Sequence, residues 1–287
     1  MSTPDQHLAV LTARSSAERL LHVEQVPARS ARLGEWPPSV APAVLSALLA
    51  AGMTRPWSHQ RAAIDLATAG QHVVLATGTA SGKSLGYLAP VLSAASEGAA
   101  TPGGRGATAI YLAPTKALAA DQLARIGSLA VPGVRAATYD GDTPPDERRW
   151  IRDHANVVLT NPDLLHHSLL PGHERWSRFL RSLQYVVVDE CHVYRGVFGS
   201  HVAAVLRRLR RVAARYGAAP TFVLASATVS DPATHASRLI GMPVTAVTED
   251  GSPRGAMTFA LWEPATEDGR RRSATTEAAE ILAQLVL

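Results

Sequence analysis

The chain has 287 residues, of which 46% are hydrophobic and 5% aromatic, and its formal net charge is +4. It is long enough to bury a full core, and its mild basic bias permits a polyanionic partner without establishing one. The single cysteine, Cys191, excludes an internal disulfide and a thiolate metal cage. No apolar run reaches roughly 18 residues and the N-terminus lacks a signal-like apolar core, so we expect a cytoplasmic protein without a membrane partner.

Short apolar runs alternate along the chain with longer helical patterns. The expected strands are residues 72–76, 109–114, 135–140, 156–160, 185–190 and 221–226. The expected helices include residues 58–70, 116–130 and 200–217. This alternation, with strands that are almost continuously apolar, favours an α/β fold whose mostly parallel sheet is covered by helices on both faces. Ligands of such sheets bind beyond the C-terminal ends of the strands.

The alternating pattern does not fill the whole chain. Residues 1–50 precede it and are predicted to form an N-terminal extension, whereas residues 51–245 carry the α/β domain. Residues 246–287 hold one short apolar segment, a polar loop and a helical pattern that continues to the last residue without a stop signal. We therefore expect that the chain is cut where another unit begins.

The stretch 72–87, HVVLATGTASGKSLGY, places a glycine-containing turn between a strand and a helix. In this context a phosphate-binding loop surrounds phosphate oxygens with backbone N–H groups and the helix N-terminus. Lys83 would reach the β- and γ-phosphates of a nucleotide, and the Ser84 hydroxyl would ligate Mg²⁺. Thr77 stands where the strict pattern has glycine, and the alternative is a turn that contains GKS by chance.

Asp189 and Glu190 close the apolar run YVVVDE. Two adjacent carboxylates at the end of a buried strand are costly unless they hold a cation or take part in chemistry. Asp189 could hold Mg²⁺ through water, and Glu190 could orient and deprotonate an attacking water. The alternative is a solvated strand end with two ordinary acids.

The last apolar run ends in Ser226, Ala227 and Thr228. Small hydroxyl side chains let strand ends approach closely, and they can hydrogen-bond a neighbouring acid or histidine. Alone these three residues carry no signal, but they become informative downstream of the acidic pair.

Together these segments resemble the first RecA-like domain of a superfamily 2 helicase of the DExH type. The matching segments are GMTRPWSHQ (52–60), TGTASGKS (77–84), APTKALAADQ (113–122), YDGD (139–142), TNPDLL (160–165), DECH (189–192) and SAT (226–228). The resemblance implies a RecA-like P-loop NTPase fold, a three-layer sandwich around a mostly parallel sheet. Residues 246–287 would then be the opening strand and helix of a second, truncated RecA-like domain.

The resemblance also implies a site for ATP and Mg²⁺. Its nucleotide-binding residues would be Gln60 at the adenine and the loop residues Thr79, Ala80, Ser81, Gly82, Lys83 and Ser84. Ser84 and Asp189 would hold the metal, and the catalytic residues would be Lys83, Asp189, Glu190 and His192. His192 would couple this site, with Ser226 and Thr228, to the second domain. That domain would supply the catalytic arginines, so we expect this chain to hydrolyse ATP poorly.

Nucleic acid would cross the same strand ends. The residues that resemble the phosphate-holding positions of the family are Pro114, Thr115, Lys116, Gly141, Asp142, Thr160, Asn161 and Pro162. Contacts to phosphates position a strand without reading its sequence, so binding should tolerate any sequence and weaken with salt. We expect single-stranded DNA as the partner, with RNA left open.

A narrower resemblance joins HVEQVPAR (22–29), RPWSHQ (55–60), DECHVYRGVFGSHVA (189–203) and LWEP (261–264) to the MrfA and SftH family of bacterial DNA-repair helicases. Members of that family are 3′-to-5′ translocases on single-stranded DNA. They carry a C-terminal domain with a four-cysteine metal site, which the one cysteine here cannot supply. The chain therefore resembles the N-terminal part of such a protein.

Several positions depart from the superfamily pattern. Met53, Trp57 and His59 stand where an aromatic, a Ser/Thr and an aliphatic residue are usual, and Ala80 stands where the loop has glycine. Because an L-residue disfavours left-handed backbone, we expect Ala80 to limit that conformation and to reshape the loop.

Two charged clusters have more ordinary interpretations. Arg207, Arg211 and Arg215 could form a stripe for DNA, but a solvated helix face is favoured. A set of histidines, His166, His167 and His173, could suggest a metal, but no carboxylate or thiolate stands at ligand spacing, so histidines on a helix surface are favoured. For Cys191 we expect packing alone.

Three rival functions remain. A P-loop kinase would not explain the later motifs. An RNA helicase of the DExH group shares most of them and stays open. A nucleic-acid-binding module with an inactive ATP site is disfavoured by the intact Lys83, Ser84, Asp189 and Glu190.

Overall fold

The computed structural model describes residues 4–12, 17–97, 104–267 and 269–286. The chain forms two compact units. The larger unit spans residues 32–252, and the smaller, which we call the terminal unit, combines residues 1–31 with 253–287. These boundaries differ from the predicted ones after residues 50 and 245. The prediction that residues 246–287 open a second RecA-like domain stays a prediction.

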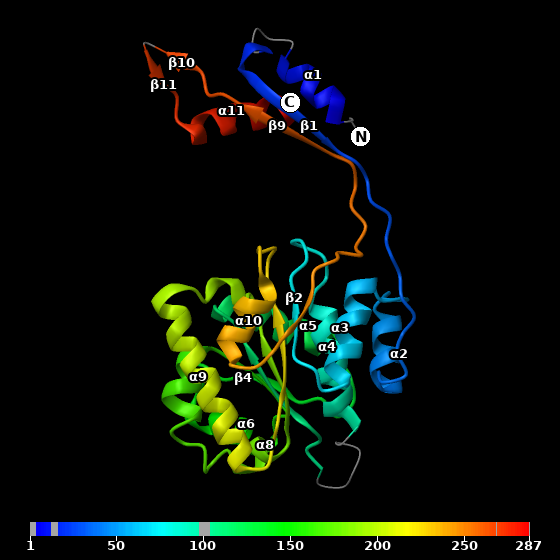
Figure 1. The fold of residues 1–287 in the computed structure, drawn as a ribbon, viewed down its shortest axis with the longest axis vertical. Coiled ribbons are helices and arrows are strands. Elements are labelled where there is room, and N and C mark those ends of the chain that lie inside the picture. Colours follow the sequence, from blue (N-terminus) through cyan, green and yellow to red (C-terminus); the bar gives the residue numbers. More distant parts are fainter. Residues whose placement is uncertain (1–3, 13–16, 98–103, 268, 287) are drawn as a thin grey trace. The chain divides into compact units, whose positions relative to one another are not determined.

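The larger unit is built on a seven-stranded sheet with the order β4-β5-β3-β6-β7-β2-β8 (Figure 1). Each neighbouring pair of strands in it is parallel. The strands are β2 (Val73–Leu75), β3 (Thr108–Leu112), β4 (Ala136–Thr138), β5 (Val157–Thr160), β6 (Leu183–Val188), β7 (Thr221–Ala225) and β8 (Thr245–Val247). All six predicted strands are present, and β8 adds an edge strand that was not predicted.

Helices cover both faces of this sheet, which gives the three predicted layers. The helical elements are α2 (Pro42–Ala50), α3 (Ser58–Thr68), α4 (Ser84–Glu97), α5 (Lys116–Leu129), α6 (Pro145–His154), α7 (Pro162–Leu164), η3 (Leu165–Leu169), α8 (Ser177–Arg181), η4 (Cys191–Val193), α9 (Gly196–Arg215) and α10 (Pro232–Ile240). In Figure 1, α9 and α10 lie on one side of the sheet, and α2, α3 and α4 lie on the other.

Two apolar clusters explain why the strands are apolar throughout. In β2, Val74 packs into one cluster with α9 and α10, whereas Val73 and Leu75 pack into the other with α2, α3 and α4. Successive side chains of a strand point to opposite faces, so a strand covered on both faces must be apolar at each position. The carboxyl ends of the strands meet at one edge of the sheet, which we call the carboxyl edge.

The terminal unit pairs the two ends of the chain. Strand β1 (Leu20–Val26) runs antiparallel to β9 (Met257–Trp262). The unit also contains α1 (Pro4–Thr12), η1 (Ala17–Arg19), the short hairpin of β10 (Thr266–Glu267) and β11 (Arg270–Arg271), and α11 (Ala274–Val286). A largely buried ion pair joins Arg19 to Glu277, whose carboxylate also accepts from the Trp262 indole N–H at 3.1 Å.

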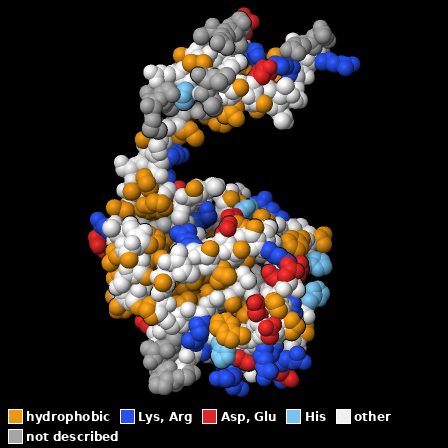
Figure 2. Space-filling view, turned by 180° about the vertical axis from the view of Figure 1, so that it is seen from behind, with side chains coloured by type: hydrophobic (Ala, Val, Ile, Leu, Met, Phe, Trp, Pro, Cys, Tyr) orange, Lys and Arg blue, Asp and Glu red, His pale blue; other side chains and the backbone are white. Residues whose placement is uncertain are grey.

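Charge is dispersed on the face seen in Figure 2. Lys and Arg side chains are interspersed there with Asp and Glu side chains. The basic excess of the sequence therefore does not gather into one large patch on this face. Among the described residues, no helix is both long and apolar enough to cross a membrane.

Candidate nucleotide-binding site

The predicted phosphate loop leaves β2 at the carboxyl edge and leads into α4. Lys83 Nζ donates to the carbonyl oxygens of Gly78 at 2.8 Å and Thr77 at 3.2 Å, so the loop folds around its own lysine. Below it, the buried hydroxyls of Thr77 and Ser81 lie 2.7 Å apart. Thr77, which stands where the strict phosphate-loop pattern has glycine, thus stabilises the loop through a buried hydrogen bond to Ser81.

Two residues of the loop adopt left-handed backbone. The φ angles are 60° at Ala80 and 64° at Gly82. The prediction that Ala80 limits this conformation is therefore wrong, because the alanine itself adopts it. The strain is tolerated since hydrogen bonds of the flanking residues fix the backbone on either side.

Side chains at the N-terminus of α3 hydrogen-bond the backbone of the phosphate loop. Gln60 accepts from the Trp57 backbone N–H at 2.8 Å and donates to the Gly82 carbonyl at 2.9 Å. His59 is buried, and its Nδ1 accepts from the Gly251 N–H at 3.1 Å, so its Nε2 carries the proton that is donated to the Ser81 carbonyl at 2.8 Å. Sequence reasoning noted His59 as a departure but did not foresee this role.

The acidic pair follows β6, on the same edge as the loop. Asp189 Oδ2 accepts from the hydroxyls of Tyr111 and, at 3.3 Å, Tyr87, while Oδ1 accepts from the Glu190 N–H at 2.9 Å. Burial is the main cause that raises the pKa of both phenols, so they stay protonated donors. Both phenols therefore hold the carboxylate of the predicted Mg²⁺ ligand Asp189 in place.

His192 lies between the acidic pair and the end of β7. Its Nδ1 is 3.1 Å from the Ala227 backbone nitrogen and 3.1 Å from Glu190 Oε2. Nδ1 can bond only one of these partners at a time. Without a hydrogen it accepts from the Ala227 N–H, and with a hydrogen it donates to the Glu190 carboxylate. Ser226 donates to the Ala227 carbonyl at 2.8 Å, whereas the Thr228 side chain is exposed.

Cys191 is fully buried, and burial is the main cause that raises the pKa of its thiol to about 12. A thiol that stays protonated is a poor nucleophile, which agrees with a packing role. Of the predicted surface histidines, His173 hydrogen-bonds the Tyr216 hydroxyl at 2.7 Å, and His166 and His167 contact each other edge to face. No group of three or more metal-binding side chains occurs in the described part of the chain.

The loop and the acidic pair line one cavity of 350 Å³. Besides loop residues 80–84, Asp189 and Glu190, it is lined by Tyr111 and by Leu118, Asp121, Gln122 and Arg125 of α5. Gln122 is buried, and its amide nitrogen has no hydrogen-bond partner in the structure. Gln122 ends the segment APTKALAADQ (113–122) but was not predicted to face the nucleotide; its place in that segment was the available signal.

The eight residues predicted to contact nucleic acid follow three neighbouring strands, β4, β5 and β3, at the carboxyl edge. Several of them already have partners. Lys116 pairs with Asp142, and the Thr115 and Asn161 side chains cap the N-termini of α5 and α7. The Thr160 side chain is buried, so contact with a ligand would use its backbone.

Known proteins share this sequence and architecture. The profile of the DEAD/DEAH box helicase family matches residues 57–236. The uncharacterized ATP-dependent helicase YprA of Bacillus subtilis is 37% identical over 270 residues, which are 92% of this chain and 35% of that protein. The ATP-dependent helicase HRQ1 of Saccharomyces cerevisiae is 38% identical over 284 residues, which are 94% of this chain and 25% of that protein.

Among solved structures, the DUF1998 helicase MrfA bound to DNA and AMPPNP matches with a TM-score of 0.89 and 35% identity, over 99% of this chain and 39% of that one. The DEAD-box helicase Mss116 bound to single-stranded RNA matches at 17% identity with a TM-score of 0.61, which supports the fold alone. The chain spans about a quarter to two fifths of the length of these full relatives. From the match over residues 57–236, the chain belongs to the DEAD/DEAH box helicase family.

Proposed function

We propose that this chain is the ATP-binding motor domain of a longer 3′-to-5′ DNA helicase or single-stranded-DNA translocase that acts in DNA repair. One observation carries the proposal: the phosphate loop and the acidic pair line the same 350 Å³ cavity at the carboxyl edge of the sheet. The names of the relatives, ATP-dependent helicases in Bacillus and yeast, support it. A cytoplasmic location stays a prediction.

Binding of ATP would replace hydrogen bonds within the phosphate loop by hydrogen bonds to phosphate oxygens. Lys83 would leave the carbonyls of Thr77 and Gly78 for the β- and γ-phosphates, whose oxygens are stronger acceptors. Backbone N–H groups of residues 79–84 at the start of α4 would bind further phosphate oxygens. Gln60 keeps one N–H and one lone pair beyond its present hydrogen bonds, and these would meet the adenine.

The residues beside the phosphates fit Mg²⁺, a hard cation that prefers oxygen ligands and is commonly held by one or two protein groups plus water. Ser84 would ligate it directly and Asp189 through water, with Tyr87 and Tyr111 fixing the carboxylate. When bound, the cation neutralises charge on the phosphate oxygens. Glu190 would orient the attacking water and accept its proton, and His192 would link this step to the end of β7.

The nucleic-acid partner we propose is single-stranded DNA, laid across the loops that follow β3, β4 and β5. The helicase MrfA has been crystallised bound to DNA, and 98% of this chain matches that protein with 36% identity. Exposed Thr115, Lys116 and Gly141 offer a hydroxyl, an ammonium group and a backbone N–H to phosphates.

The site is tested on the 287-residue chain by titrating it with a fluorescent ATP analogue in Mg²⁺. Lys83→Ala should weaken binding about tenfold or more, because it removes a charge-assisted contact to phosphate. Arg215→Gln, an exposed change outside the cavity, is the matched control. Equal affinity of the Lys83→Ala and unmodified chains would contradict the proposed site.

Turnover is tested separately, on the full-length protein and on this chain. The chain alone should hydrolyse ATP roughly 10³-fold or more slowly, since a second domain would supply the arginines that stabilise the transferring phosphoryl group. In the full-length protein, Glu190→Gln should abolish turnover but preserve nucleotide binding. Stimulation of its ATPase by RNA, but not by single-stranded DNA, would replace the DNA proposal with the RNA alternative.

A further inference from the structure

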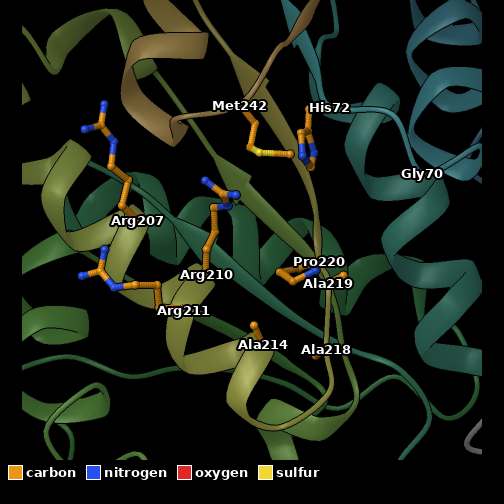
Figure 3. A pocket seen from close by; sticks show the side chains of 10 residues that line it. All are labelled: Gly70, His72, Arg207, Arg210, Arg211, Ala214, Ala218, Ala219, Pro220 and Met242. Carbon is orange, nitrogen blue, oxygen red and sulfur yellow. The ribbon is translucent and has the colours of Figure 1, made fainter.

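A second group of cationic side chains lies at the edge of the sheet opposite the phosphate loop. The parallel strands begin at this edge, where His72 precedes β2, Pro220 precedes β7 and Met242 precedes β8. A hollow of 510 Å³, which we call the arginine pocket, lies beside these strand starts (Figure 3). Its side-chain donors are His72, Arg207, Arg210 and Arg211.

Two of the arginines are held in place by the C-terminal end of α10. Arg207 Nη2 donates to the Arg238 carbonyl at 2.7 Å, and Arg210 Nη1 donates to the Ile240 carbonyl at 2.8 Å. These carbonyls lack partners within their helix, and cations are favourable there. Each guanidinium has five N–H groups, so both keep several donors for a ligand.

The remaining side chains complete a set of donors. The half-buried Arg210 points toward His72 and Met242, whereas the more exposed Arg207 and Arg211 extend away from His72 (Figure 3). His72 Nδ1 accepts from the Phe222 backbone N–H at 3.1 Å, so its Nε2 carries the ring proton. Burial, and then the charge of Arg210, lower the pKa of His72, which leaves it a neutral donor at pH 7. Of the described residues that line the pocket, none has a carboxylate.

We propose that the arginine pocket binds a phosphate group, at a site separate from the nucleotide cavity. Arg210 and His72 offer donors that point toward each other, Arg207 and Arg211 add positive charge, and no carboxylate competes, which suits an oxyanion; a guanidinium group can bind two phosphate oxygens at once. The phosphate belongs either to a nucleic-acid backbone or to a free oligophosphate, which offer the same chemistry.

One feature favours the nucleic-acid backbone as the source. Arg211 also lines a second hollow of 500 Å³, together with Arg208 and Pro162 and with one carboxylate, that of Asp163. Pro162 is one of the predicted nucleic-acid contacts. Arg208 and Arg211 of α9 therefore lie between the loop that contains Pro162, at the carboxyl edge, and the arginine pocket, at the opposite edge.

The test uses Arg211→Gln, because Arg211 is exposed and lines both hollows. Arg215→Gln is the matched control, since Arg215 is an exposed arginine of the same helix outside both hollows. Inorganic tripolyphosphate is titrated calorimetrically into chains that also carry Lys83→Ala, which disables the phosphate loop. A labelled oligothymidylate is titrated by fluorescence anisotropy, and thermal melting verifies that each variant is folded.

Arg211→Gln should weaken tripolyphosphate binding about tenfold, while Arg215→Gln leaves it unchanged. If oligothymidylate binding weakens too, the phosphate belongs to a strand; if only tripolyphosphate binding weakens, it belongs to a free oligophosphate. Equal affinities of Arg211→Gln and Arg215→Gln for both ligands would overturn the proposal. With Lys83 intact, Arg211→Gln should bind an ATP analogue normally, and a loss there would refute a separate site.

Discussion

Ala80 and Gly82 both adopt left-handed backbone, but only at Gly82 is there no space for a Cβ. A Cβ at Gly82 would lie 2.7 Å from Gln60 Nε2 and 2.8 Å from Trp57 Cζ3, so glycine is needed there for space as well as for conformation. Ala80 is exposed and carries its Cβ in a conformation that costs an L-residue about 1–2 kcal/mol. This cost makes Ala80 a strained point next to the phosphate-binding N–H groups.

Replacing Ala80 with glycine should therefore not destabilise the chain. The relief of about 1 kcal/mol at the loop offsets the backbone entropy that glycine loses on folding. The matched control is Ala62→Gly inside α3, which should lower the free energy of unfolding by about 1 kcal/mol. Urea unfolding of both variants gives the comparison, and equal losses would show that Ala80 is not strained.

The two phenols on Asp189 should contribute unequally to stability. Tyr111→Phe removes a hydrogen bond to the half-buried Asp189 carboxylate and should lower the free energy of unfolding by about 1.5–3 kcal/mol. Tyr87→Phe removes a hydrogen bond of 3.3 Å to the same carboxylate and should lower the free energy of unfolding by less. Chemical denaturation measures both, and a larger loss for Tyr87→Phe would contradict the assigned geometry.

The sequence identifies some site residues and misses others for a physical reason. Lys83 and Asp189 belong to short motifs whose spacing follows from one strand and one turn, so local patterns reveal them. Tyr87, Tyr111 and Gln122 occupy ordinary buried positions of a helix or strand, and only tertiary packing turns their polar atoms toward the cavity.

At the scale of single elements, caps explain where helices begin. Asp231 precedes α10, and its carboxylate accepts from the Thr234 backbone N–H at 3.1 Å. Hydrogen bonding to Thr234, first from its side chain and then from this backbone N–H, lowers the pKa of Asp231 below its ordinary value of 3.8. The Arg207 and Arg210 guanidinium groups bind the other end, so α10 is held at both termini.

The cap gives α10 a pH dependence of known sign. Because the folded-state pKa is depressed, the stabilisation is present above 3.8 and is lost as the pH falls through the lowered value. Asp231→Asn keeps a capping oxygen but does not titrate. The difference in free energy of unfolding between the two chains should shrink between about pH 6 and about pH 3, as measured by urea unfolding. If the two free energies of unfolding differed by the same amount at every pH, the Asp231 carboxylate would not be the source of the pH dependence.

Strand β8 shows where sequence patterns stop being informative. Five of the predicted strands, β2, β3, β5, β6 and β7, are largely buried, whereas β8 is a three-residue edge strand, Thr245–Val247, that is only partly buried. Its position is fixed by pairing with β2, a long-range contact with no local signature. The same holds for β1 and β9, whose pairing joins the ends of the chain.

At the scale of the whole molecule, the terminal unit depends on a charge cluster of its own. Glu277→Ala removes the partner of the largely buried Arg19 and should destabilise that unit by about 3 kcal/mol. The matched control is Glu280→Ala, whose exposed pair with Arg272 should matter much less. Hydrogen exchange should speed up in β1 and β9 but not in β6. Equal acceleration in β6 would show that Glu277 supports the whole chain.

The pairing of β1 with β9 also sets an order of events during synthesis. Val26 leaves the ribosome more than two hundred residues before its partner Met257. At typical translation rates this interval lasts roughly 10 to 50 seconds. Residues 32–252 emerge within it, so the larger unit is almost fully synthesised when Met257 appears. The first strand to be made is thus among the last to pair, and its backbone N–H and C=O groups wait for β9 throughout that time.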